Sequence, residues 1–273
     1  MKRLCIPIMM AVLLTACGHR IVSGTDTDLL VFSSDSSAYS DSTVEVKVNF
    51  DYPVAGPQPL TDSLIAYIFH QLDINSPSDD AIFTKRKELA TEWQEMSENG
   101  FSMQLYYTRS LTLLLDTTLY VTLQNSIEEF HGGPHGSYLY YGQTFRKSDG
   151  LRIGYVSVYD EDKMMYRTEQ QNLLKDTDSP AFCALLKEGV RQYFADNEQE
   201  VATDEQLAEN LLGVNDINHM PLPQYPPHFI KEGLSFIYQQ YEIAPYAAGL
   251  PSFIIPYDKI RPFLTKEALS LIE

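Results

Sequence analysis

Basic residues are scarce in this chain of 273 residues, where 20 lysines and arginines stand against 37 aspartates and glutamates. The formal net charge of −17 at pH 7 repels nucleic acids and anionic lipid headgroups and favours cationic partners. We therefore expect no nucleic-acid partner, and we interpret most of the charge as a solvated surface. Apolar residues make up 44% of the chain, which excludes a disordered protein.

Long apolar runs are missing as well, since a transmembrane helix needs about 20 consecutive apolar residues. The apolar run Leu4–Leu14, which follows Lys2 and Arg3, has only 11 residues. Its length and its basic flank are typical of a secretory signal. The sequence Leu14-Thr15-Ala16-Cys17, which ends the run, resembles the processing site of bacterial lipoproteins.

This resemblance implies that residues 1–16 are a signal peptide and that Cys17, which becomes the first mature residue, is the lipid attachment site. Several acyl chains would then hold the protein on a membrane. The alternative is an ordinary signal peptide in which Cys17 is incidental. With lipidation we expect a cell-envelope location, at the outer membrane and facing the periplasm.

Cysteine is nearly absent from the mature chain. Cys5 would leave with the signal and Cys17 would carry lipid, so that Cys183 alone would stay free. An intramolecular disulfide is then excluded. Because Cys183 lies in an apolar helical pattern with Phe182 and Leu185, we predict a small buried core residue and not a nucleophile.

Several motifs of enzymes and cofactor-binding proteins are missing. The sequence has no serine nucleophile elbow, phosphate-binding loop, dinucleotide fingerprint or calcium loop. His131 and His135 are four residues apart, a metal-binding spacing on a helix, but the Gly132-Gly133-Pro134 between them disfavours a helix. We therefore predict no catalytic residue, no cofactor and no metal ion, and we expect both imidazoles to form hydrogen bonds in a tight loop.

The N-terminal part of the fold is expected to span residues 43–150. Residues 17–42, rich in serine, aspartate and threonine, have the composition of a flexible tether. From Thr43 to Phe50 apolar and polar residues alternate, as in a half-buried strand. Further elements are predicted as helices from Asp62, capped by Thr61 or Asp62, and over Lys85–Asn99, and as strands over Phe101–Leu115, Leu119–Phe130 and Ser137–Phe145.

The C-terminal part, residues 151–273, again mixes helices with short strands. Ser179 before Pro180 fits the start of a helix that runs to about Asn197. A shorter helix is expected from Asp204, and Lys231-Glu232-Gly233 is expected to form a hairpin turn. Because each half combines an antiparallel sheet with helices, the sequence predicts an α+β fold.

Two segments resemble a known family. Tyr238–Gly249 reads Tyr-Gln-Gln-Tyr-Glu-Ile-Ala-Pro-Tyr-Ala-Ala-Gly and is followed by Phe253–Tyr257. It resembles a motif near the C-terminus of the extracytoplasmic domain that RsiV-like anti-sigma factors and PdaC-like peptidoglycan deacetylases share. Phe130–Gly136 resembles the Gly-Gly-Ala-His-Gly signature in the N-terminal half of that domain, with Pro134 in place of the alanine. The resemblance covers Thr43 to Glu273.

The resemblance implies an α+β fold in two linked parts, of which the C-terminal part is similar to a small subdomain of actin-like ATPases. In RsiV-like members the domain binds lysozyme, and in PdaC-like members it precedes a separate catalytic domain. We recognise no deacetylase domain and no sigma-binding segment in this sequence. The resemblance therefore implies binding, not catalysis, with lysozyme or peptidoglycan as the partner.

The candidate ligand-binding residues lie in the two motifs. They are Tyr241, Glu242, Pro245, Tyr246, His131 and His135. A rigid loop of small residues with large aromatic rings suits recognition, and it equally suits a corner of the core.

These residues predict a lipid-anchored binding domain for a cell-envelope component or for a cationic protein such as lysozyme. Two alternatives stay open. One is an envelope hydrolase whose site is assembled from distant residues, with one of the two histidines and a carboxylate. The other is a structural lipoprotein of an envelope complex.

Overall fold

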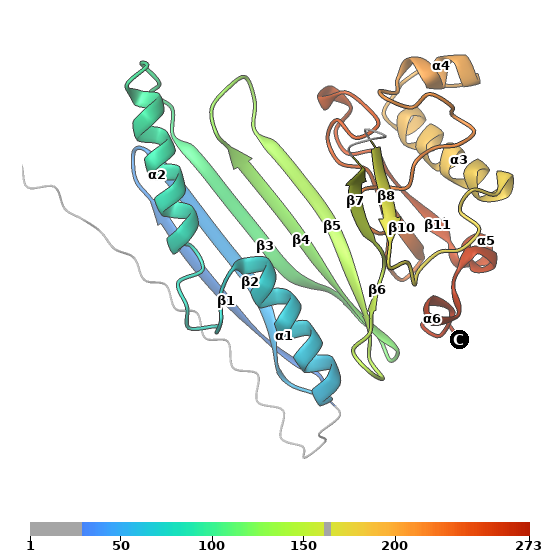
Figure 1. The fold of residues 1–273 in the computed structure, drawn as a ribbon, viewed down its shortest axis with the longest axis horizontal. Coiled ribbons are helices and arrows are strands. Elements are labelled where there is room, and N and C mark those ends of the chain that lie inside the picture. Colours follow the sequence, from blue (N-terminus) through green and yellow to red (C-terminus); the bar gives the residue numbers. More distant parts are fainter. Residues whose placement is uncertain (1–28, 161–164) are drawn as a thin grey trace, which may run out of the picture.

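The computed structural model describes residues 29–160 and 165–273 (Figure 1). The predicted signal peptide and the predicted lipid attachment site, Cys17, lie outside the described residues. Among the helices that are described, none has the length and apolar character needed to cross a membrane.

The N-terminal part is built on a sheet whose six strands lie side by side in chain order. The strands are β1 Val31–Ser40, β2 Val44–Ala55, β3 Leu105–Asp116, β4 Tyr120–Phe130, β5 Ser137–Arg146 and β6 Arg152–Ile153. The alternation predicted for β2 is confirmed, since Val44, Val46, Val48 and Phe50 are all buried. A register shift of one residue would expose all four side chains.

The sheet is mixed, not purely antiparallel as expected. β2 and β3 pair in parallel, with Val44 opposite Leu105 and Phe50 opposite Leu111, while the other neighbours are antiparallel. Two helices lie in the chain between β2 and β3. Such a crossover returns the chain to the edge where the previous strand began, which makes the next strand parallel.

The first strand corrects the expected tether. β1 pairs with β2 along its whole length, from Val31 opposite Ala55 to Ser40 opposite Glu45, so the tether expected over residues 17–42 is wrong for Val31–Ser40. The side chains of β1 are mostly polar because the strand lies at the edge of the sheet. Backbone hydrogen bonds hold it there, and they leave no hydrophobic pattern in the sequence.

Two helices cover one face of this sheet (Figure 1). α1 spans Gln58–Leu72 and buries Leu60, Leu64 and Ile68 against the sheet, and α2 spans Phe83–Ser97. α1 begins before the expected Asp62, because Pro57 precedes it and Pro59 lies in its first turn, where proline costs no hydrogen bond. The caps expected at Thr61 or Asp62 are therefore wrong.

The C-terminal part mixes helices with short strands as expected, although the strands at residues 156–160 and 165–169 were not predicted. The elements are β7 Val156–Asp160, β8 Met165–Glu169, α3 Pro180–Asp196, α4 Asp204–Glu209, β9 His228–Phe229, β10 Gly233–Ile237, η1 Tyr246–Ala248, β11 Ser252–Pro256, α5 Tyr257–Ile260, η2 Arg261–Phe263 and α6 Lys266–Leu269. The Ser179 cap is confirmed, since its hydroxyl accepts a hydrogen bond from the Phe182 amide at 3.3 Å. Cys183 is buried in α3, as predicted.

Each part has its own hydrophobic core, and β4 and β5 join them. Val121 and Leu123 on β4 belong to the first core, whereas Tyr120 contributes to the second. The Thr122 hydroxyl donates to the Phe229 carbonyl at 2.9 Å, and the Phe229 amide donates to the Thr144 hydroxyl at 3.1 Å. The predicted α+β class is thus confirmed, and β9 of the C-terminal part docks on threonines of the N-terminal sheet.

Candidate functional site

The loop between β4 and β5, residues 131–136, is the first of two loops that form the candidate site. Gly132 and Gly133 have φ angles of 86° and 93°, a region that residues with a side chain rarely adopt. The two glycines therefore allow the chain to reverse between the two strands. His135 is exposed at this end of the sheet.

The second loop, residues 239–249, follows β10. Its first turn is closed by the Glu242 amide, which donates to the Gln239 carbonyl at 3.1 Å. Tyr241, the third residue of this turn, has a φ of 64°, where glycine or asparagine is usual. The ring of Tyr241 is 57% exposed, so this backbone strain is not repaid by burial of the side chain.

The structure brings the two loops together. The rings of His135 and Tyr246 stack with their centroids 3.7 Å apart and their planes 21° apart. The Tyr241 hydroxyl lies 3.2 Å from Nε2 of His135, and Nδ1 of His135 lies 2.9 Å from the Gly136 carbonyl. Since a carbonyl only accepts, Nδ1 donates and Nε2 accepts from Tyr241, which fixes the tautomer of a neutral imidazole.

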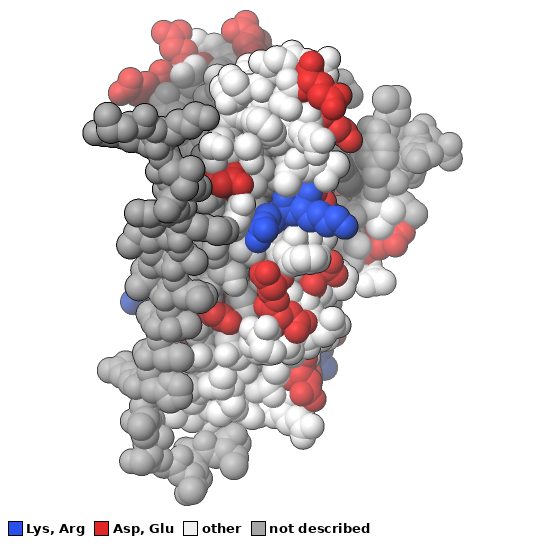
Figure 2. Space-filling view, turned by 90° about the vertical axis from the view of Figure 1, so that its left-hand side faces the viewer, with Lys and Arg blue, Asp and Glu red and all other residues white. Residues whose placement is uncertain are grey.

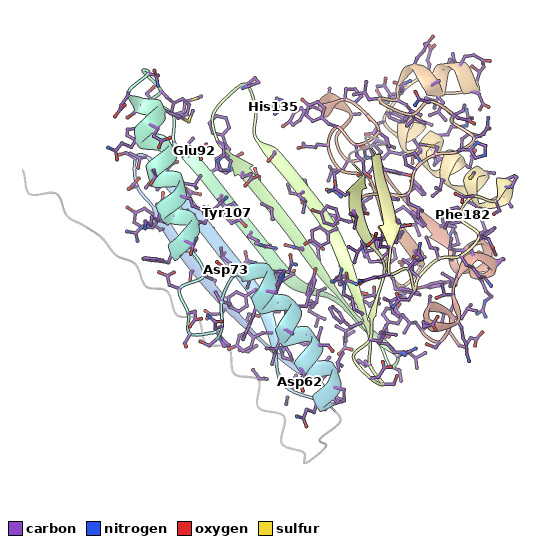
Figure 3. All side chains as sticks on the ribbon, viewed as in Figure 1. Asp62, Asp73, Glu92, Tyr107, His135 and Phe182 are labelled. Carbon is purple, nitrogen blue, oxygen red and sulfur yellow. The ribbon has the colours of Figure 1, made fainter. Side chains whose placement is uncertain are left out.

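Figure 3 places His135 on the β4–β5 loop, on the side that faces the C-terminal part. Three of the six predicted ligand-binding residues, His135, Tyr241 and Tyr246, therefore form one exposed aromatic group. We name it the aromatic triad. His135 lies more than 100 residues from the two tyrosines in the chain.

Glu242 has a different position from the one expected of a ligand-binding residue. Its carboxylate accepts hydrogen bonds from the backbone amides of Gln224 at 2.5 Å and Gln239 at 2.7 Å. Burial raises the pKa of this carboxyl from 4.5 to about 7. Through these two hydrogen bonds, Glu242 links the turn that contains Tyr241 with the proline-rich segment that precedes β9.

Pro245 is exposed and begins the short helix η1, which presents Tyr246. The Tyr193 hydroxyl of α3 donates to the Ala248 carbonyl at the end of that helix, at 2.6 Å. The loop is therefore held at both ends, so that the ring of Tyr246 is positioned before any ligand arrives.

His131, which lies on the same loop as His135, links α2 to the sheet. Its Nδ1 lies 2.6 Å from a Glu92 oxygen, and its Nε2 lies 3.2 Å from a Glu129 oxygen. Both carboxylates accept hydrogen bonds, so His131 binds both of them fully only when it is protonated. Among residues 29–160 and 165–273, no group of three histidine, cysteine or acidic side chains is arranged to hold a metal ion.

A cleft of about 360 Å³ runs from the β4–β5 loop along the edge of β5. We name it the β5 cleft. Its walls include Glu129, His131, His135, Tyr138, Gln240 and Tyr241. Its size is within the range of small-molecule sites, and its wall carries aromatic rings beside a carboxylate.

Side-chain amides form the floor of the β5 cleft. The Tyr138 amide donates to Oε1 of Gln240 at 2.9 Å, and the Tyr140 amide donates to Oε1 of Gln239 at 3.1 Å. Nε2 of Gln239 donates in turn to the Tyr140 carbonyl at 2.9 Å. The side chain of Gln239 therefore forms hydrogen bonds with the backbone amide and carbonyl of Tyr140, as a neighbouring strand would.

Acidic groups surround the triad. Glu128 lies 3.4 Å from the Tyr106 hydroxyl, and Glu129 is 3.3 Å from the Ser137 hydroxyl, both within the adjoining ends of β3, β4 and β5. On the side of the molecule that carries β1 and α2, Figure 2 shows acidic side chains spread over the described surface and most basic atoms gathered in one group. Closer to the triad, Glu129 lines the β5 cleft together with His135 and Tyr241, so a carboxylate lies in the same cleft as these rings.

The sequence identified the two loops but not their neighbours. Gln239 and Gln240 lie within the recognised motif, yet their bonds to β5 join residues about 100 positions apart. Tyr106, Tyr138 and Glu129 occur in strands, where tyrosine is common for reasons of packing alone. Their nearness to the triad follows from strand order, which local sequence patterns do not specify.

The comparisons with known proteins agree on one family. Residues 171–258 match the family described as "Protein of unknown function (DUF3298)". The matched range contains the loop of residues 239–249 and not the β4–β5 loop. No protein of established function among the curated ones matches the chain.

Two crystal structures of DUF3298 proteins share the fold. A member from Bacteroides fragilis has 20% sequence identity and a TM-score of 0.62, with 89% of this chain and 97% of that chain covered. A member from Pseudomonas aeruginosa has 13% identity and a TM-score of 0.59, with the same shares covered. These similarities extend over the fold of both parts.

Proposed function

We propose that this protein is a lipid-anchored, extracytoplasmic binding domain of the RsiV-like and PdaC-like group. Its ligand is a cell-envelope component or a cationic protein such as lysozyme. The observation that supports this proposal most is the stacking of His135 on Tyr246, with Tyr241 bonded to the same imidazole. Two motifs that were singled out separately thereby form one exposed surface.

The chemistry of this surface suits two kinds of ligand. Aromatic faces attract cations such as lysine and arginine side chains, and they also offer flat contact area to sugar rings. Carboxylates next to the rings, at Glu128 and Glu129, add attraction for a cationic group. A cationic protein gains from both features, and the net charge of −17 would speed its encounter.

The positive φ of Tyr241 supports a role in recognition. A residue with a side chain in this region costs about 1 to 3 kcal/mol and persists where the surroundings enforce it. Here Glu242 and the Gln239 carbonyl enforce it. The result is a tyrosine that is exposed, strained and fixed in place, which a purely structural turn does not require.

A titration with lysozyme tests the proposal. Residues 29–273 are titrated at low and at moderate salt, with Tyr246→Ala and Tyr241→Ala as variants and Tyr39→Ala on β1 as the matched control. We expect saturable binding that weakens as salt rises and that falls about tenfold or more in both loop variants. If both loop variants bind lysozyme as tightly as the unchanged chain, the triad has no role in binding. If the unchanged chain binds no lysozyme at either salt concentration, lysozyme is excluded as the ligand.

An envelope hydrolase is the second candidate, and His131 is the observation that favours it. An imidazole between two carboxylates, at 2.6 and 3.2 Å, resembles the oriented acid–base groups of enzymes. Turnover of purified peptidoglycan that disappears in His131→Ala and persists in Tyr246→Ala would establish this function. The binding function predicts no turnover in either variant.

A further inference from the structure

A second cavity lies at the other end of β5 from the β5 cleft, between α1 and the turn that joins β5 to β6. Its volume is about 710 Å³, which is within the range of small-molecule sites. Its walls include Tyr67, His70, Gln71, Phe145 and Arg152. We name it the α1 cavity, and it shares no residue with the aromatic triad.

The wall from α1 follows from helical spacing. Tyr67, His70 and Gln71 are three and four residues apart, so their side chains lie on one face of the helix. The Tyr67 ring packs edge-on against Phe145 of β5 at 5.3 Å between centroids. This contact fixes the ring at the base of the cavity.

The Tyr67 hydroxyl is the unusual group. It is buried and has no hydrogen bond of normal length and angle among the described residues. Burial, and then the neighbouring Tyr141 hydroxyl, raise the pKa of Tyr67, so the two hydroxyls lie near each other without a well-formed bond. A buried hydroxyl without a partner costs stability, and native structures usually supply one from the protein, from water or from a ligand. An oxygen atom of a bound molecule would satisfy it.

Next to this hydroxyl lies a polar network that is already satisfied. Arg109 donates to both the carbonyl and the side-chain oxygen of Gln71, and its Nε donates to Asn125 at 3.2 Å. The Tyr141 hydroxyl donates to Oε1 of Gln71 at 3.0 Å. These bonds hold Gln71 in place, so the inner wall of the cavity is rigid.

Two arginines near Tyr67 lack a carboxylate partner. Among residues 29–160 and 165–273, Arg146, Arg191 and Arg261 form ion pairs, whereas Arg109 and Arg152 form none. The nearby Asp149 is occupied, since Arg146 binds both of its oxygens at 2.9 and 2.6 Å. In a chain with a net charge of −17, two unpaired guanidinium groups beside one cavity make it a local positive site.

Arg152 is oriented for an anion. Its guanidinium lies over the Tyr67 ring, 5.6 Å from the centroid, and its Nε donates to Gln143 at 2.8 Å. The terminal nitrogens remain for a ligand, and a fixed, planar guanidinium suits the two oxygens of a carboxylate. We propose that the α1 cavity binds a small molecule that carries a carboxylate, with the carboxylate on Arg152 and another oxygen at the Tyr67 hydroxyl.

Three probes separate the chemical groups. N-acetylmuramic acid carries a lactyl carboxylate, N-acetylglucosamine is the same sugar without it, and lactate is the carboxylate arm without the sugar. The full chain, held in mild detergent, is titrated with each probe by calorimetry. We expect N-acetylmuramic acid to bind at least about tenfold more tightly than N-acetylglucosamine. Equal binding of these two, or no binding of any probe at about 20 mM, would overturn the proposal.

Lactate identifies the source of the carboxylate. If lactate binds as tightly as N-acetylmuramic acid, the site accepts free small carboxylates. If lactate binds much more weakly, it accepts acidic sugars. Both results support the proposal, and neither depends on whether the triad binds lysozyme, because the two surfaces share no residue.

Variants assign the binding to the cavity. Arg152→Gln is expected to weaken the binding of N-acetylmuramic acid at least about tenfold. The matched control is Arg86→Gln, which removes another guanidinium that lies over a tyrosine ring, 4.0 Å from the centroid of Tyr39. Equal losses in the two variants would mean general electrostatic attraction and would refute the site.

Tyr67→Phe gives an independent readout. The variant keeps the ring and its contact with Phe145 and removes only a hydroxyl that has no well-formed hydrogen bond among the described residues. We expect the folded state to persist and the affinity for N-acetylmuramic acid to fall about threefold or more. Unchanged affinity in this variant would exclude contact between the ligand and the hydroxyl.

Discussion

The strained turn at Tyr241 allows a quantitative test of how the candidate site is built. Replacement of Tyr241 by glycine removes the penalty of a positive φ, whereas replacement by alanine keeps it. Both variants lose the same ring and the same hydrogen bond to His135, which lies 3.2 Å away. The difference between the two variants therefore isolates the backbone.

The expected magnitude follows from two opposing effects. A residue with a Cβ atom in the left-handed region costs about 1 to 2 kcal/mol. Glycine also makes the unfolded chain more flexible, which lowers the stability of the glycine variant by about 0.4 to 1 kcal/mol. We therefore expect Tyr241→Gly to be more stable than Tyr241→Ala by about 0.5 to 1 kcal/mol, even though glycine is the more flexible residue.

Urea denaturation of residues 29–273 measures this difference, provided that the dependence of the unfolding free energy on urea stays the same in both variants. Neither variant is expected to bind the ligand of the triad, so stability and binding should separate. If Tyr241→Ala is as stable as Tyr241→Gly or more stable, the turn is not strained, and the support that strain gives to a recognition role disappears.

Three further measurements test single features of the fold. Because the pKa of Glu242 is raised from 4.5 to about 7, the stability that its protonation contributes is complete below pH 4.5 and is lost as the pH rises through 7. The unfolding free energy of the native chain, relative to Glu242→Gln, should therefore fall by up to about 3 kcal/mol between pH 4.5 and pH 8; a flat difference in urea titrations would contradict this. Ser179→Ala removes the cap of α3 and should lower the unfolding free energy by about 1 kcal/mol, whereas Ser148→Ala, in an exposed turn, should change it little. Tyr67→Phe removes a buried hydroxyl without a well-formed hydrogen bond among the described residues and should raise the melting temperature, by about 1 kcal/mol of stability; a clear decrease would show that the hydroxyl is satisfied.

Features encoded in neighbouring residues could be predicted from the sequence. The start of α3 at Ser179 and Pro180 is an example, because cap, proline and apolar spacing all act within one helix. The hairpin turn at Lys231-Glu232-Gly233 is another, and the Ile230 amide indeed donates to the Gly233 carbonyl at 3.0 Å. In both places the local chemistry and the final fold agree.

Features that depend on distant pairing were missed. β1 carries mostly polar residues and is held by the backbone of β2, so its composition resembles a tether. The parallel pair of β2 and β3 depends on the path of the chain through two helices. The stacking of His135 on Tyr246 joins two loops that no local pattern relates, although each loop was recognisable by itself.

The side-chain amides on β5 bear on how the protein behaves at high concentration. Within the part of the chain that the structure describes, the outer edge of β5 has no neighbouring strand over Tyr138 to Tyr140, since β6 pairs only with Thr144 and Phe145. Bare strand edges recruit strands from other molecules and start aggregation. Gln239 and Gln240 occupy the amide and carbonyl groups that such a strand would use, so another chain must displace both before it can extend the sheet there. The loop that presents Tyr241 therefore also blocks the edge of β5 against pairing with another copy of the chain.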